Sequence, residues 1–150
     1  MRKYFLLSAV ALMAASNVNA QVGELNVDAR VSVADIIECT TLSFGEIVVK
    51  LNNQETTIRT FFDEDMQIGN DIISVSGEGK ATCQLSSGSF IYGLSMNDVT
   101  LTAGENDSEL TFSPVSESGS SAIIYGTLTI PANVESGHYV GSLTVTYVDE

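Results

Sequence analysis

The stretches Ala122-Ile-Ile-Tyr-Gly-Thr-Leu-Thr-Ile130 and Tyr139-Val-Gly-Ser-Leu-Thr-Val-Thr-Tyr-Val148 decide the fold class of this chain. The first is rich in β-branched and aromatic residues, which fit a pleated sheet. In the second, Tyr139 and every second residue after it face one way, and the residues between them face the other way. Pro131 ends the first stretch because proline cannot donate to a strand ladder. Both stretches therefore predict β-strands.

Shorter stretches of the same kind fill most of the remaining chain. They are separated by turn-forming clusters such as Asn52-Asn53, Gly77-Glu78-Gly79 and Gly104-Glu105-Asn106-Asp107. Many short strands with polar turns are typical of a sandwich or a barrel, and no stretch after residue 20 sustains a helical period. We expect an all-β domain, built as an antiparallel β-sandwich, with further strands at 42–49, 56–62, 72–76, 80–85, 89–96, 99–103 and 109–112.

The first 20 residues have the parts of a secretory signal peptide. Met1-Arg2-Lys3 is the positive region, residues 5–15 are apolar, and Val18-Asn19-Ala20 is a small-residue cleavage site. The apolar part is too short for a stop-transfer helix. We therefore expect cleavage before Gln21 and export to the periplasm, and then to the cell surface.

The charge of the chain limits its partners. The formal net charge is −13 at pH 7, and removal of Arg2 and Lys3 with the signal would make it more negative. Nucleic acids and anionic membranes are bound by clustered Lys and Arg, so we expect neither as a partner of this chain. The content of 44% hydrophobic and 17% charged residues is that of a folded protein.

Cys39 and Cys83 are the only cysteines. An even number of cysteines in an exported protein predicts a disulfide, with two buried free thiols as the alternative. Their spacing fits no zinc motif. Without a Cys-x-x-Cys pair, nothing in the sequence favours a redox role.

The sequence offers little catalytic chemistry. His138 is the only histidine, and no Gly-x-Ser-x-Gly element supplies a nucleophile. We expect no enzyme, no catalytic residue, no cofactor and no metal, although a hydrolase with two carboxylates is an alternative. Two acidic clusters carry calcium-type oxygens without the spacing of an EF-hand. They are Asp63-Glu64-Asp65 with Asp71, and Glu105-Asn106-Asp107 with Glu109.

The segment Leu25–Val33 alternates apolar residues with polar ones. Alternation alone predicts two different roles for it. The segment is either the first strand of a complete sandwich or a strand that inserts into another molecule by β-augmentation.

Three features resemble chaperone–usher pilin subunits. The stretch Gly137–Glu150 resembles their final strand, and Cys39-Thr-Thr-Leu-Ser-Phe-Gly45 with Cys83 resembles their disulfide between the first two strands. Residues 21–38 have the length of a pilin donor extension. The chain is also similar to secreted bacterial domains of unknown function, related to pilins and spore-coat-like β-domains, with an early Leu-x-Phe-Gly and a late Gly-x-Tyr-x-Gly. Here these are Leu42–Gly45 and Gly137–Gly141.

The resemblance implies an Ig-like, pilin-like sandwich in residues 39–150, completed by a donor strand, after a signal peptide at 1–20 and an extension or first strand at 21–38. It implies a structural subunit of a surface fibre (pilus or fimbria), polymerised by strand exchange with other pilin-like subunits and handled by a periplasmic chaperone and usher. The implied donor-strand residues are Val22, Leu25, Val27, Ala29, Val31 and Val33. The implied chaperone or assembly strand contains Gly137, Tyr139, Gly141, Leu143, Val145 and Tyr147.

A different function class is a self-contained secreted or periplasmic β-sandwich that binds a sugar or a host protein through its loops. Such an adhesion module would carry exposed aromatic residues in loops. Phe61, Phe62 and Tyr92 lie in strand-like stretches of the sequence. Their predicted location argues against this alternative.

Overall fold

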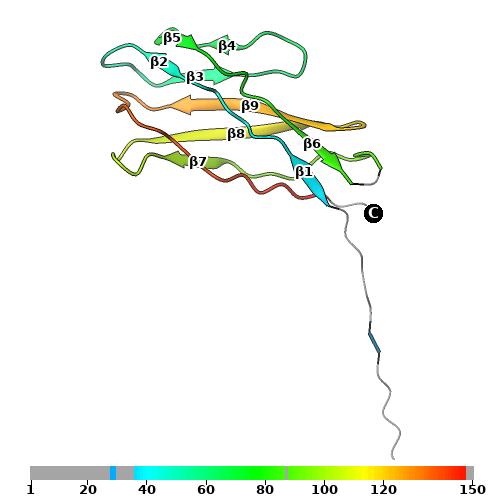
Figure 1. The fold of residues 1–150 in the computed structure, drawn as a ribbon. Coiled ribbons are helices and arrows are strands. Elements are labelled where there is room, and N and C mark those ends of the chain that lie inside the picture. Colours follow the sequence, from blue (N-terminus) through cyan, green and yellow to red (C-terminus); the bar gives the residue numbers. More distant parts are fainter. Residues whose placement is uncertain (1–27, 30–35, 87, 148–150) are drawn as a thin grey trace, which may run out of the picture. The chain divides into compact units, whose positions relative to one another are not determined.

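The computed structural model describes residues 28–29, 36–86 and 88–147 (Figure 1). The chain divides into two units, Met1–Val33 and Ala34–Glu150, and all of the described strands belong to the second. Of the donor-strand candidates, Ala29 is exposed and belongs to no strand. The others, which are Val22, Leu25, Val27, Val31 and Val33, lie outside the described residues.

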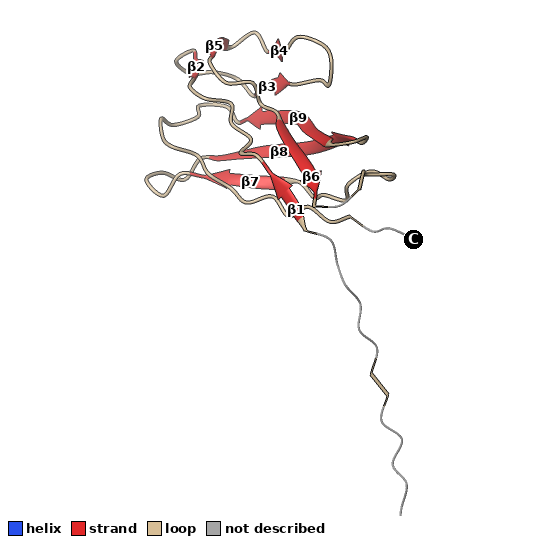
Figure 2. Ribbon diagram, turned by 45° about the vertical axis from the view of Figure 1, so that its right-hand side comes forward, coloured by secondary structure: helices blue, strands red, loops and turns tan. Residues whose placement is uncertain are grey.

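All regular elements of the described residues are antiparallel β-strands (Figure 2). They form a seven-stranded and a two-stranded sheet. Because the described residues contain no helix, none of them forms a helix that could cross a membrane. The strands are β1 (Ile37–Cys39), β2 (Ile47–Val49), β3 (Thr56–Arg59), β4 (Gln67–Ile68), β5 (Ile72–Val75), β6 (Ala81–Leu85), β7 (Val99–Thr102), β8 (Glu109–Glu117) and β9 (Ala122–Ile130).

Strand β9 organises the larger sheet. One edge of β9 pairs with β8, which in turn pairs with β7. The other edge of β9 is shared, since β3 pairs with its C-terminal half and β6 with its N-terminal half. Strand β4 then pairs with β3, and β1 with β6. The smaller sheet consists of β2 and β5.

Gly126 lies where β3 and β6 meet along β9. The Thr60 amide donates to the Gly126 carbonyl (2.8 Å), and the Gly126 amide donates to Thr60 Oγ1 (2.9 Å). A Cβ on Gly126 would lie 2.2 Å from the Ser113 carbonyl oxygen on β8. Only glycine therefore allows β8 and Thr60 to approach β9 together at this position.

Two clusters of buried side chains form the core. Ile58, Leu128 and Ile130, each at most 2% exposed, belong to the first cluster, which also contains Phe44 and Phe112 in edge-to-face contact at 5.7 Å. The second cluster surrounds Cys83 and includes Ala81, Phe90, Leu94, Ala122 and Ile124. Every second residue of β9 is buried, so this strand contributes to both clusters.

The predicted disulfide is confirmed. Cys39 and Cys83 are paired directly across β1 and β6, with an S–S distance of 2.05 Å. Beside it, the Ile36 amide donates to Ser86 Oγ (3.3 Å), and the Ser86 amide donates to the Ile36 carbonyl (3.0 Å). The start of β1 is therefore fastened to β6 by covalent and hydrogen bonds.

The predicted strands agree with the structure to different degrees. Strand β9 has the predicted bounds, whereas β8 continues five residues beyond the predicted Phe112. The strand predicted at 42–49 forms only at β2, because Gly45 adopts a φ of +65° and interrupts the extended backbone. The strand predicted at 89–96 is wrong. That segment is irregular and makes a single bridge, at Ser95.

The final predicted strand is also not regular. It makes two isolated bridges, Val140 with Thr102 and Thr146 with Ser95. Ser95 and Thr102 are seven positions apart, whereas Val140 and Thr146 are six positions apart, so the register shifts by one residue between the two bridges. The predicted alternation survives between Leu143 and Tyr147, whose odd-numbered residues are half-buried and whose even-numbered ones are exposed.

Candidate functional site

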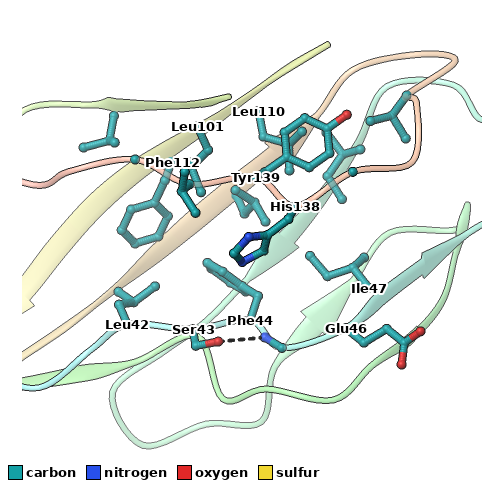
Figure 3. Close-up of a pocket in the computed structure, with 18 of the residues that line it drawn as sticks. Leu42, Ser43, Phe44, Glu46, Ile47, Leu101, Leu110, Phe112, His138 and Tyr139 are labelled. Atoms are coloured by element: carbon teal, nitrogen blue, oxygen red, sulfur yellow. Dashed lines mark hydrogen bonds between the residues drawn. The ribbon is translucent and has the colours of Figure 1, made fainter. Parts of the chain in front are cut away.

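A groove with a volume of about 710 Å³ lies between residues 41–49 and residues 134–143 (Figure 3). We call residues 41–49 the first wall and residues 134–143 the second wall. The groove floor is apolar, because β7, β8 and β9 turn hydrophobic side chains toward it. These are Val99, Leu101, Leu110, Phe112, Leu128 and Ile130.

The first wall is attached to the turn between β5 and β6. The Gly77 amide donates to the Phe44 carbonyl (2.8 Å), and the Glu46 amide donates to Ser76 Oγ (2.7 Å). A Cβ on Gly77 would lie 2.2 Å from the Phe44 carbonyl carbon, so this contact requires glycine. With Phe44 only 7% exposed, the Leu-Ser-Phe-Gly element is a structural part of this wall.

The second wall is attached to the turn between β7 and β8. The Tyr139 hydroxyl donates to the Glu135 carbonyl (2.6 Å) and lies 3.2 Å from Asn106 Oδ1. Asn106 Nδ2 donates to the Ser136 carbonyl (3.0 Å), and the Glu135 amide donates to Ser108 Oγ (3.1 Å). These bonds fasten the second wall to the turn between β7 and β8.

Asn53 joins the turn after the first wall to the start of the second wall. Its side chain donates from Nδ2 to the Pro131 carbonyl (2.8 Å) and accepts at Oδ1 from the Val134 amide (3.1 Å). Its main-chain carbonyl accepts from the Asn133 amide (2.9 Å). Because Asn53 is only 2% exposed, these groups have no water to replace the lost partners.

Asn53→Ala is therefore expected to destabilise the domain by about 3 kcal/mol, because it leaves the Val134 amide and the Pro131 carbonyl without this partner. Gln54→Ala is the matched control, since Gln54 is exposed and bonds through its backbone. Urea unfolding of both variants measures the difference. Equal midpoints for the two variants would show that Asn53 does not hold the walls together.

Both walls have an unpaired edge toward the groove. Among the described strands, β2 pairs only with β5, and both backbone groups of Val140 bond to Thr102. Neighbouring residues in an extended chain direct their backbone groups to opposite edges. Those of Tyr139 and Gly141 therefore point away from β7, and they form no hydrogen bond within the described residues. The groove thus combines an apolar floor with two free strand edges.

The sequence-predicted assembly strand divides at this groove. Gly137, Tyr139, Gly141 and Leu143 line it, whereas Val145 and Tyr147 pack against the second core cluster. His138 also lines the groove and is exposed (Figure 3). Sequence reasoning missed the floor and Asn53. The Asn52-Asn53 pair was visible only as a turn signal.

The acidic clusters do not form a metal site in the part of the chain that is described, where no three His, Cys, Asp or Glu side chains gather. Asp71 instead accepts from the Gln54 amide (2.8 Å) and pairs with Lys50 (3.3 Å). These two contacts, with the amide hydrogen bond contributing most, lower the pKa of the Asp71 carboxyl.

Comparison with protein-family models, with curated proteins and with solved structures finds no match to this chain. The structure shows an all-β domain with antiparallel sheets and one disulfide. The groove is therefore the feature from which a function is inferred.

Proposed function

We propose that this protein is a structural subunit of a bacterial surface fibre, an Ig-like β-sandwich that lacks one strand and polymerises by strand exchange. The observation that carries this proposal is the open groove between the two walls. An extended segment placed there would pair with both free edges and bury its apolar side chains on the floor. The two wall segments would otherwise expose these edges to water.

The N-terminal segment Leu25–Val33 suits the groove in length and pattern. It has nine residues, which is the length of the first wall, residues 41–49. Its apolar residues recur at every second position, so all of them would face the floor of the groove. This match supports the segment as the inserted strand.

We also propose that the chain is exported and that a periplasmic chaperone binds it before assembly. The confirmed disulfide is consistent with an extracytoplasmic location. A subunit with an open apolar groove would aggregate before assembly, because unpaired strand edges template further pairing. We therefore include a periplasmic chaperone that covers the groove beside the second wall, and an usher at the outer surface.

The test is a denaturing gel of periplasmic and sheared surface material from cells that express the chain, with unboiled and boiled samples compared. Strand exchange predicts a ladder at single-subunit increments that collapses on boiling. A single monomer band, with a cooperatively folding monomer in solution, would contradict the proposal.

One observation favours the alternative of a self-contained binding module. Phe62 and Tyr92 lie in irregular segments and are 46% and 53% exposed, so the prediction that they lie in strands was wrong. Ile91 beside Tyr92 is 71% exposed. If the chain is an adhesion module, Tyr92→Ala should reduce binding to immobilised glycans or host proteins, and polymerisation should be absent.

A further inference from the structure

The groove is apolar inside and acidic at its edges. Glu46 on the first wall, labelled in Figure 3, and Glu135 on the second wall both line it, and both are exposed. Lys50 and Asp71 form the only ion pair among the described residues, so neither glutamate is paired with a cation. The groove lining contains no Lys or Arg. The two walls of the groove therefore each carry one exposed, unpaired carboxylate.

The inserted segment carries one cation. When Leu25, Val27 and the following odd-numbered residues face the floor, Arg30 faces outward at the centre of the segment. Neighbouring strands lie about 4.8 Å apart, so a long side chain on the inserted strand can reach carboxylates on both flanking strands. Of the other three cations after the signal, Lys50 pairs with Asp71, Lys80 donates to the Phe62 carbonyl, and Arg59 is exposed on β3.

Asp28 disfavours one alternative register of the inserted strand. It also faces outward, two residues before Arg30, and the two glutamates would repel it. Sliding the strand by two residues would exchange Arg30 for Asp28 between the walls. Attraction and repulsion together therefore favour one register of the inserted strand.

Ile36 anchors the chain that follows the Leu25–Val33 segment to β6. From Ile36 to Thr41, where the groove begins, the backbone follows β6, with the Thr40 amide donating to the Thr82 carbonyl (2.9 Å). Ile36 is therefore held beside β6, three residues after the end of the Leu25–Val33 segment.

We propose that the groove takes the Leu25–Val33 segment of a second copy of this chain, and that Glu46 and Glu135 select this segment and set its register by attracting Arg30. This inference rests on the proposed function, to which it adds the identity of the partner and the residues that choose it. The two glutamates would repel an apolar strand that carries an acidic residue at the position of Arg30, so the groove would not bind it.

Charge reversal in the full-length chain tests the inference by the gel assay. Arg30→Glu alone, and Glu46→Lys with Glu135→Lys alone, are each expected to weaken every junction about tenfold and to shorten the ladder. A chain with all three substitutions regains the ladder. Co-expression of the two defective chains also regains it, since each donor strand then meets a groove of opposite charge.

The matched control is Glu109→Lys with Glu117→Lys. Both residues are exposed on β8 and lie outside the groove lining, so the total charge changes equally. This control should keep the full ladder. Thermal unfolding of each variant establishes that the domain is folded.

The outcomes separate this inference from the proposed function. If the unmodified chain forms no ladder, the proposed function fails. If it forms a ladder that Arg30→Glu leaves unchanged, or that the β8 control shortens equally, selection by the two glutamates is overturned and strand exchange stands. If the triple variant regains the ladder and co-expression does not, attraction between Arg30 of one copy and the two glutamates of another is overturned.

Discussion

Replacing Leu25 and Val27 with aspartate is expected to yield a folded monomer that forms no ladder. Each aspartate would place a charge on the apolar floor without a partner, at a cost of several kcal/mol for every junction. The groove itself is built from residues 41–143 and does not change. Gel analysis of unboiled samples and circular dichroism of the purified variant measure assembly and folding separately.

The control for this variant adds the same charge elsewhere. Asn97→Asp with Ser120→Asp places two carboxylates at exposed positions outside the groove, so assembly should be retained. If the Leu25 and Val27 variant instead fails to fold, the segment is the first strand of its own domain. That result would favour a complete sandwich and contradict strand exchange.

Removing the disulfide is expected to destabilise the domain by about 4 kcal/mol, the chain-entropy estimate for a loop of this size. The sequence separation of Cys39 and Cys83 is 44 residues. Cys83 is completely buried in the second core cluster, so Cys83→Ala with Cys39→Ser avoids burying a hydroxyl. Urea unfolding of the variant and of the oxidised protein gives the difference.

Reduction of the unmodified protein provides an independent comparison, because it opens the bond without changing the side-chain carbon atoms. The reduced protein and the variant should unfold at similar urea concentrations. A loss of less than about 1 kcal/mol in both would show that hydrogen bonds at Ile36 and Thr40 hold β1 without the disulfide.

The predicted strands differ in accuracy for a physical reason. Strand β9 is buried at every second residue and pairs with other strands along both edges. Its residue types therefore reflect both its burial and its place inside a sheet. The segment 89–96 contains the same residue types, yet Phe90 is buried by contact with Tyr147 at 5.2 Å rather than by a strand ladder. Aromatic residues are common in strands, so one buried aromatic side chain gives an irregular segment the composition of a strand.

Part of the groove lining lies in a stretch that the sequence singles out. Gly137, Tyr139, Gly141 and Leu143 belong to a stretch that the sequence singles out, and all four line the groove. The roles of Asn53 and of Phe44 could not be predicted, because each depends on partners far along the chain. Asn53 bonds to Pro131 and Val134, and Phe44 contacts Phe112.

The sequence by itself determined the β class, the central strand and the identity of the disulfide, since apolar alternation and the presence of only two cysteines are local or compositional facts. Only the tertiary structure decided that the two walls stand apart with free edges above an apolar floor. Alternation with a period of two shows which side chains share a face of a strand. It contains no information on which backbone edge finds a partner, because strand pairing joins residues that are distant in the chain.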